Sequence, residues 1–193
     1  MADKPKILAF SGSARTGSLN KKLVAVAAEA AESAGGEVTL IDLRDFPMPV
    51  YDGDLEAEHG LPENAKQLKT LFIEHQGLLI SSPENNASVS SLLKNTIDWL
   101  SRQDGAVSGL APYQGKVAGL LAASPGALGG IRGLPHLRAI LDTLGVLVLP
   151  GQMAVSKANT AFDENGALLE ERYQTAIKSL CERLVETCRR LKV

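Results

Sequence analysis

The sequence predicts an α/β fold in which a parallel sheet of five strands is covered by helices on both faces. Five short apolar segments alternate along the chain with five segments of helical periodicity, and this alternation is typical of βα units. The apolar segments are largely continuous, as strands buried on both faces require. A chain of 193 residues, 45% of them hydrophobic, suits one domain over residues 1–193.

The first strand and helix open the chain. Residues 6–11 form a compact apolar run, and a helical pattern begins near Ser18 and stops at Gly35, where helices favour a left-handed residue. Residues 37–43 alternate like a second strand. Residues 44–65 are rich in Pro and Gly and are expected to form a long loop, which is uncommon without a function.

The remaining elements continue the alternation. Strands are expected at residues 77–82, 116–124 and 146–150, and helices at residues 62–75, 88–102, 134–145 and 168–191. In open parallel sheets, ligands bind beyond the carboxyl ends of the strands. This rule selects three loops, which follow Ser11, Ser82 and Ser124.

Charge and composition argue against several classes of protein. The net charge of −2 disfavours nucleic-acid binding, which usually needs a basic excess. The N-terminal segment does not resemble a signal peptide, and no segment approaches the ~20 apolar residues of a membrane span. We therefore expect a cytoplasmic protein that does not contact a membrane. Cys181 and Cys188 are expected to be reduced thiols on the last helix, and no metal site is indicated.

The first selected loop, FSGSARTGSLN, is rich in small hydrogen-bond donors around a single cation. Ser13, Ser18 and Asn20 offer side-chain donors, and Arg15 offers a bidentate charged contact. Gly12 lets the backbone approach a ligand. Because a helix follows, its unpaired N–H groups and partial positive charge would also attract an anion. The loop therefore predicts a phosphate site.

Two familiar phosphate-binding patterns are not met. Gly12 and Gly17 have the spacing of a P-loop, but Ser18 stands where the P-loop lysine belongs. The three-glycine dinucleotide pattern fails because Ala14 stands two positions after Gly12. The loop is instead a Ser- and Asn-rich turn, which suits a terminal phosphate monoester such as that of FMN. The alternative is an ordinary βα turn capped by serine.

The second selected loop and the helix after it complete a resemblance. The first loop is similar to the signature Gly-Ser-x-Arg-x-x-Ser-x-Asn of the NADPH-dependent FMN reductases, a group that includes quinone, chromate and azo-dye reductases. Residues 83–102 resemble the second signature of that family. Residues 43–56 and 124–130 are also similar to segments of the family, so the resemblance covers nearly the whole chain, in order. The matching positions are Pro83, Glu84, Asn86, Ser88, Leu93, Lys94, Asn95, Ile97, Asp98, Trp99, Ser101 and Arg102.

The resemblance implies a flavodoxin-like three-layer fold with strand order 2-1-3-4-5 and FMN as the cofactor. It assigns Ser11, Ser13, Arg15, Ser18 and Asn20, with Leu19 among them, to the phosphate end of the cofactor. It assigns Pro83, Glu84, Asn85, Asn86 and Ser88 to the edge of the isoalloxazine ring, mostly through backbone groups. Ser124, Pro125, Gly126, Gly129 and Gly130 would form a third wall.

The resemblance also implies an activity. We expect hydride transfer from NADPH or NADH to FMN and then to a quinone or a similar small acceptor, such as free flavin, chromate or an azo compound. The cofactor carries such chemistry, so no catalytic acid or base is named. The region of Tyr51, Asp52 and Asp54 would contribute to a homodimer or homotetramer. The alternatives are a flavodoxin-like electron carrier and a scaffold of this fold without flavin.

One position departs from the family, and a few polar residues have two interpretations. Asn85 stands where the family usually has a tyrosine beside the ring. The loss of this aromatic side chain would affect substrate preference first and flavin affinity second. Trp99 is expected to pack in the core. Arg102 and Arg132 are expected either to attract the phosphates of NAD(P)H or to be ordinary surface residues. Asp42 is a weak candidate for a ribose ligand, and His136 is expected on a helix surface.

Overall fold

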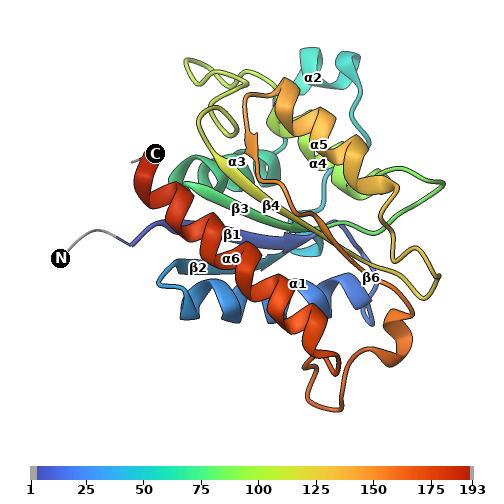
Figure 1. Ribbon diagram of the computed structural model, residues 1–193. Helices are drawn as coiled ribbons and strands as arrows, with labels where there is room; N and C mark the ends of the chain where they lie inside the picture. The colour runs from blue at the N-terminus through green and yellow to red at the C-terminus, as the bar shows by residue number, and fades with distance from the viewer. Residues whose placement is uncertain (1–3, 192–193) are drawn as a thin grey trace.

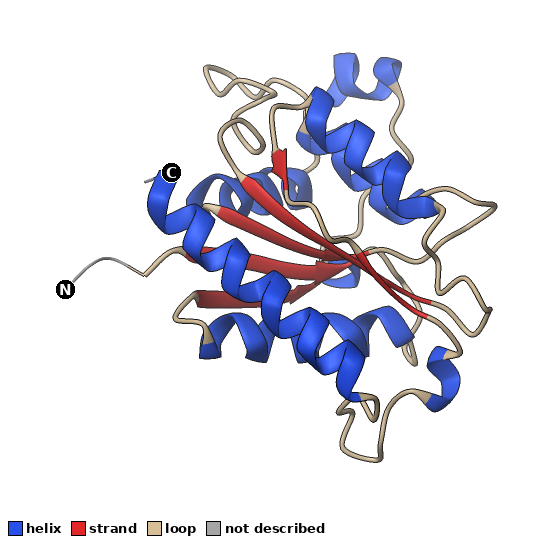
Figure 2. Cartoon of the chain, viewed as in Figure 1, coloured by secondary structure: helices blue, strands red, loops and turns tan. Residues whose placement is uncertain are grey.

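The computed structural model describes residues 4–191, which form a parallel sheet between two layers of helices (Figure 1; Figure 2). The strand order is β2-β1-β3-β4-β5, with β6 also paired to β4, so the predicted flavodoxin-like order is confirmed. The strands are β1 (Lys6–Ser11), β2 (Glu37–Asp42), β3 (Gly77–Ser81), β4 (Val117–Ala123), β5 (Leu147–Val148) and β6 (Met153–Val155).

The fifth strand differs from the prediction for residues 146–150. It is interrupted: Val117 and Ala118 pair with β5, whereas β4 pairs with β6 from Leu121 onward. Pro150 lies between the two short strands and has no N–H group to donate to a ladder. The chain therefore leaves the sheet after β5. It then pairs again with the same edge of β4 as β6, closer to the carboxyl end of β4.

Helices cover both faces of the sheet. They are α1 (Leu19–Ser33), α2 (Gly53–His59), α3 (Glu63–Glu74), α4 (Ser91–Leu100), α5 (Gly133–Thr143) and α6 (Glu171–Leu191), with short 3₁₀ turns at Leu43–Asp45 and Ala158–Thr160. One core cluster packs α1 and α6 on the sheet, and a second packs α3, α4 and α5 on the opposite face. Ile7 and Ala9 of β1 belong to the first cluster and Leu8 and Phe10 to the second, so the strand is buried on both sides, as predicted.

The expected loop at residues 44–65 is partly helical. Helix α2 starts after Asp52, whose carboxylate accepts a hydrogen bond from the Asp54 N–H at 2.8 Å, and it ends at Gly60, with φ 70°. No residue of α2 is buried. The apolar periodicity that reveals a packed helix is therefore absent from this segment, and only its capping residues indicate where it lies.

Trp99 of α4 is fully buried, which confirms its expected packing role. Its Nε1–H donates to the carbonyl of Pro49 at 2.8 Å, and its ring meets that of Tyr51 edge-on with centroids 5.1 Å apart. Asn95, one turn earlier, also donates to Pro49 and accepts from the Tyr51 N–H. Helix α4 thus fixes the segment that leads into α2.

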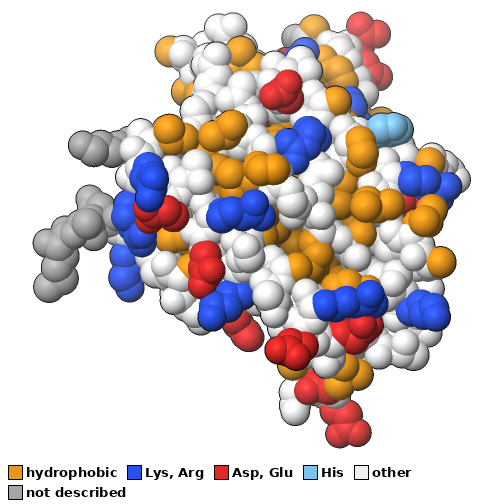
Figure 3. Space-filling view, in the orientation of Figure 1, with side chains coloured by type: hydrophobic (Ala, Val, Ile, Leu, Met, Phe, Trp, Pro, Cys, Tyr) orange, Lys and Arg blue, Asp and Glu red, His pale blue; other side chains and the backbone are white. Residues whose placement is uncertain are grey.

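The surface carries both signs of charge. On the face shown in Figure 3, acidic and basic side chains are interspersed, consistent with the net charge of −2. Within residues 4–191, no helix has the length and apolar character needed to cross a membrane. Cys181 and Cys188 of α6 are buried as free thiols.

Candidate functional site

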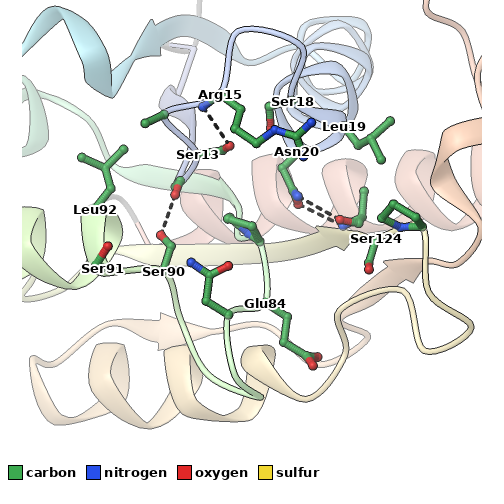
Figure 4. A pocket seen from close by; sticks show the side chains of 16 residues that line it. Ser13, Arg15, Ser18, Leu19, Asn20, Glu84, Ser90, Ser91, Leu92 and Ser124 are labelled. Atoms are coloured by element: carbon green, nitrogen blue, oxygen red, sulfur yellow. Dashed lines mark hydrogen bonds between the residues drawn. The ribbon is translucent and has the colours of Figure 1, made fainter.

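A cavity of about 340 Å³ lies beyond the carboxyl ends of β1, β3 and β4 (Figure 4). Its volume is within the range of sites for small ligands and cofactors. The cavity is lined by Gly12, Ser13, Ala14, Arg15, Ser18, Leu19, Asn20, Pro83, Glu84, Asn85, Ser90, Ser91, Leu92, Ala123, Ser124 and Pro125. All three loops selected from the sequence therefore converge on one space.

Most of the residues expected to contact a cofactor line this cavity, and some do not. Those outside its lining are Ser11, Asn86, Ser88, Gly126, Gly129 and Gly130. The sequence interpretation also missed lining residues at the start of α4, namely Ser90, Ser91 and Leu92. A signal for them was present, because serines that precede an apolar periodic run indicate a helix N-terminus.

The first loop leads directly into α1. Ser18 is the N-cap of this helix, and its hydroxyl accepts a hydrogen bond from the Lys21 N–H at 3.4 Å. The Ser13 hydroxyl accepts from the Arg15 N–H at 3.4 Å. The first N–H groups of a helix have no partner within the helix. Those of Leu19 and Asn20 therefore lie at the cavity as backbone donors.

A second helix starts at the same cavity. Ser90 caps α4: its hydroxyl accepts from the Leu93 N–H at 3.2 Å and donates to the Gly12 carbonyl at 2.5 Å. A side chain at Gly12 would be crowded at this junction, since a Cβ there would lie 3.0 Å from the Leu93 Cβ. Two helix N-termini, each with partial positive charge, thus face one space, which favours an anion between them.

Arg15 adds a full positive charge. Its side chain is exposed, and no acidic side chain in residues 4–191 forms an ion pair with it. In Figure 4 it lies on the same side of the cavity as Ser13 and Ser18. Glu84 is the only acidic residue among those that line the cavity, and it is paired with Arg132 instead. The charge of Arg15 is therefore available for an anionic ligand.

Asn20 has a role that was not expected. Its side chain is buried, its Oδ1 accepts from the Ala123 N–H and the Ser81 hydroxyl at 2.9 Å each, and its Nδ2 donates to the Ala123 carbonyl at 2.9 Å. These bonds join α1 to the ends of β3 and β4. One amide N–H is left for a ligand, so Asn20 mainly holds the three loops in register.

Ser11 and Asp42 lie on the far side of the first loop. The Ser11 hydroxyl is buried without a hydrogen-bond partner among residues 4–191, in a gap beside Lys21 and Asp42 and not in the cavity. Asp42 contacts Lys21 at 2.6 Å and Arg44 at 2.8 Å, and Arg44 donates to the Thr16 hydroxyl at 3.1 Å. Burial raises the pKa of Asp42, but hydrogen bonds from Arg44 and Lys21 outweigh it and hold the pKa well below its usual range. Asp42 thus braces the loop, and its position does not support a role as ribose ligand.

The second loop forms a tight hairpin. The N–H groups of Asn85 and Ser88 each donate to the carbonyl of the other at 3.0 Å. Glu84, just before the hairpin, points away from Arg15 and Ser18 in Figure 4. Its carboxylate accepts from the Arg132 N–H at 2.9 Å and from Arg132 Nε at 2.8 Å. These bonds hold the pKa of Glu84 below its ordinary value.

The third loop reaches the cavity through Ser124 and Pro125. The Ser124 hydroxyl accepts from the Gly126 N–H at 3.2 Å, which stabilises the turn. Gly129 has a φ of 64°, and a Cβ at this position would lie 2.8 Å from the carbonyl carbon of Val155. Gly129 is therefore needed for close packing on β6, which explains the glycine without any ligand.

Comparison with known proteins agrees with this geometry. The family model described as NADPH-dependent FMN reductase matches residues 5–160. This chain belongs to the NADPH-dependent FMN reductase family. It is therefore an FMN-dependent NAD(P)H oxidoreductase, as its sequence predicted, and neither the carrier nor the flavin-less alternative is favoured.

Two curated relatives and two solved structures illustrate the relationship. This FMN reductase is 34% identical over 193 residues to an NAD(P)H-dependent FMN reductase of Pseudomonas aeruginosa, with all of both chains covered. It is 34% identical over 149 residues to a quinone reductase of Escherichia coli K12, covering 77% of this chain and 76% of the relative. FerB, a flavoenzyme NAD(P)H:(acceptor) oxidoreductase of Paracoccus denitrificans, superposes with a TM-score of 0.77 at 25% identity, covering 97% and 98% of the two chains. An archaeal flavodoxin, at 12% identity and a TM-score of 0.59 over 95% of this chain and 98% of its own, shares the fold.

The residues that line the cavity of this FMN reductase fit the phosphate of FMN. A phosphate monoester carries up to two negative charges and accepts several hydrogen bonds. The cavity supplies the backbone donors of two helix starts, the hydroxyls of Ser13 and Ser18, and the guanidinium of Arg15. Donor type and charge therefore both match.

Proposed function

We propose that the cavity at the carboxyl ends of β1, β3 and β4 holds FMN, with its phosphate between the N-termini of α1 and α4. One observation carries this proposal: the guanidinium of Arg15, which forms no ion pair within residues 4–191, lies beside two helix N-termini in one cavity. Pro83 to Asn85 and Ser124 to Pro125 line the rest of the cavity and would flank the isoalloxazine ring. The whole chain would act as a single FMN-binding domain.

Bound FMN supplies hydride and electron transfer between a nicotinamide and a small acceptor. The protein contributes binding and orientation. Backbone N–H groups at the loops beyond β3 and β4 would favour negative charge on a bound flavin, since fixed dipoles stabilise charge without reorganising. No side chain needs to act as acid or base, so variants of the lining residues should change cofactor affinity and acceptor choice.

We infer that NADPH or NADH is the electron donor and that a quinone is an acceptor. The relatives support this inference: they include the quinone reductase of E. coli and a 2-hydroxy-1,4-benzoquinone reductase of a Burkholderia species. Asn85 lines the cavity where the resembling family usually has tyrosine. The smaller amide leaves more room beside the ring, so bulkier acceptors should be accommodated.

We also propose that the protein is a cytoplasmic homodimer. Val50 is 84% exposed, although α4 holds Pro49 and Tyr51 on either side of it through hydrogen bonds from Asn95 and Trp99 and an edge-on ring contact. Pro47 and Pro49 in the same segment are exposed as well, and a rigid segment that presents several neighbouring apolar side chains to water favours a protein interface. Replacement of Val50 by Asp should therefore produce a monomer in sedimentation experiments, whereas a wild-type protein that is itself monomeric would refute the dimer.

A spectrum of the purified protein, before and after addition of FMN, tests the proposed function. We expect a yellow protein whose flavin absorbance bleaches rapidly when mixed with NADPH in a stopped-flow instrument and returns when benzoquinone is added. A protein that takes up FMN and does not bleach would support the electron carrier. A colourless protein that takes up no FMN would support the flavin-less scaffold.

A further inference from the structure

The hairpin at Asn85–Ser88 is held in a conformation that its sequence does not favour. Asn86 and Ala87, the two residues at its tip, have φ of 50° and 61°. Two successive left-handed residues match the twist of a two-residue hairpin, for which Asn followed by Gly is preferred. Asn tolerates the left-handed region, but the Cβ of alanine is disfavoured there. Contacts outside the hairpin must therefore stabilise Ala87.

The first external contact comes from Glu84. Its carboxylate accepts three hydrogen bonds from Arg132, from the backbone N–H, Nε and Nη2. The Glu84 side chain is only 9% exposed, whereas that of Arg132 is 58% exposed. The carboxylate is thus shielded from water and bonded to Arg132, the residue immediately before α5. The bonds from the guanidinium, in which both partners are charged, are stronger than neutral ones.

A second external contact lies at the other end of the hairpin. The Ser88 hydroxyl and the His136 Nδ1 are 2.9 Å apart, and His136 lies one turn into α5. The backbone of α5 also touches the hairpin: a Cβ on Gly133 would lie 2.9 Å from the Ser88 carbonyl oxygen. The first turns of α5 therefore hold both ends of a four-residue hairpin located 48 residues earlier in the chain.

We propose that Glu84 and His136 are positioning residues, which clamp the hairpin at residues 85–88 to α5 and so fix the backbone that flanks the flavin ring. His136 does not line the cavity, and Glu84 lines it with a carboxylate that is already bonded to Arg132, so neither side chain needs to touch the cofactor. Asn85 lines the cavity, whereas Asn86 and Ser88 do not. The clamp therefore acts through Asn85 and the backbone around it. The effect of the clamp on flavin affinity rests on the proposed function, whereas its effect on the conformation of the hairpin does not.

Amide hydrogen exchange in the protein without added flavin tests the clamp directly. The Asn85 and Ser88 N–H groups are bonded to each other's carbonyls and should exchange slowly. Glu84→Gln and His136→Ala should each speed the exchange of both groups roughly fivefold to twentyfold, as expected for loss of one good hydrogen bond. The control is Glu186→Gln, which breaks an exposed ion pair with Arg189 and Arg190 on α6. Exchange that stays unchanged in both clamp variants overturns the proposal.

A variant that relaxes the hairpin tip separates positioning from general destabilisation. Glycine adopts the left-handed conformation without the strain of an alanine Cβ, so Ala87→Gly should make the hairpin less dependent on its clamp. When combined with Ala87→Gly, Glu84→Gln should therefore speed exchange less than half as much as it does alone. Additive effects would show that Glu84 does not hold the strained tip, and would overturn the proposal. If Glu84→Gln fails to fold, the same comparison with His136→Ala decides, because His136 is exposed.

Flavin titrations then connect the clamp to the cofactor. Because the clamp acts at the ring, Glu84→Gln should weaken FMN and riboflavin to the same extent, by roughly threefold to tenfold. A loss confined to FMN, or no loss for either flavin, would overturn the link to the ring. If the wild-type protein binds neither flavin, the proposed function fails, and the exchange experiment still decides whether the clamp exists.

Discussion

Replacement of Arg15 by alanine is the sharpest test of the proposed phosphate site. Arg15 is the one charged side chain at the cavity without a partner of opposite charge in residues 4–191. Charge-assisted hydrogen bonds to a phosphate contribute about 1.5 to 3 kcal/mol. Since the Arg15 side chain is exposed, the lower half of this range is expected. A loss of about 2 kcal/mol corresponds to a roughly 30-fold weaker affinity for FMN.

Quenching of flavin fluorescence measures this affinity, and riboflavin provides the essential comparison. Riboflavin has the ring of FMN without the phosphate, so Arg15→Ala should leave its affinity unchanged. Arg15→Lys should fall between wild type and alanine, because it keeps the charge and loses the bidentate geometry. Arg172→Ala, which removes an exposed arginine paired with Glu170, is a matched control. Equal losses of FMN and riboflavin affinity, or none, would refute the assignment of the phosphate to this loop.

Three further predictions concern other parts of the site. Asn20→Ala should lower the free energy of unfolding by about 2 to 4 kcal/mol in urea titrations, because it leaves the Ala123 backbone and the Ser81 hydroxyl without their hydrogen-bond partner. An unchanged urea midpoint would contradict the role of Asn20 between β3 and β4. Asn85→Tyr should tighten FMN binding roughly threefold to tenfold through added aromatic contact and raise KM for bulky quinones, and steady-state kinetics that show neither change would count against its place beside the ring. Asp42→Asn should destabilise the protein at neutral pH and not in strong acid. The folded pKa of Asp42 is depressed, so its contribution is present above the unfolded pKa of about 4 and is lost as pH falls; a cost that persists in acid would exclude this ion-pair origin.

The alternation of apolar and amphipathic segments was sufficient to predict the sheet and its covering helices, because burial on two faces leaves a strong pattern. The same pattern gave no signal for a helix that has no buried face. Helix α2 has no buried residue, so nothing in its periodicity distinguishes it from a loop. The division of the last strand into β5 and β6 was also missed, although Pro150 gave a local signal.

The candidate site was likewise predicted only in part from the sequence. The Ser-rich loop around Arg15, followed by a helix, indicates an anion site from sequence alone, because the donors are local to one turn. The second helix start, at Ser90, is brought to that loop by a hydrogen bond to Gly12 across 78 residues. The Asn20 side chain was expected at the phosphate, and Glu84 was expected to flank the ring mostly through its backbone. In the structure most bonds of the Asn20 side chain go to Ala123 and Ser81, and the Glu84 carboxylate is bonded to Arg132.

The sequence by itself determined the order of the elements, the position of the three loops at one edge of the sheet, and the presence of a cation among small donors. These follow from local propensity, hydrophobic periodicity and the geometry of parallel strands. Only the tertiary structure decided which polar side chains face the cavity and which hold the loops together. A buried polar group must find a hydrogen-bond partner, and the partner that it finds is set by packing between segments far apart in the chain.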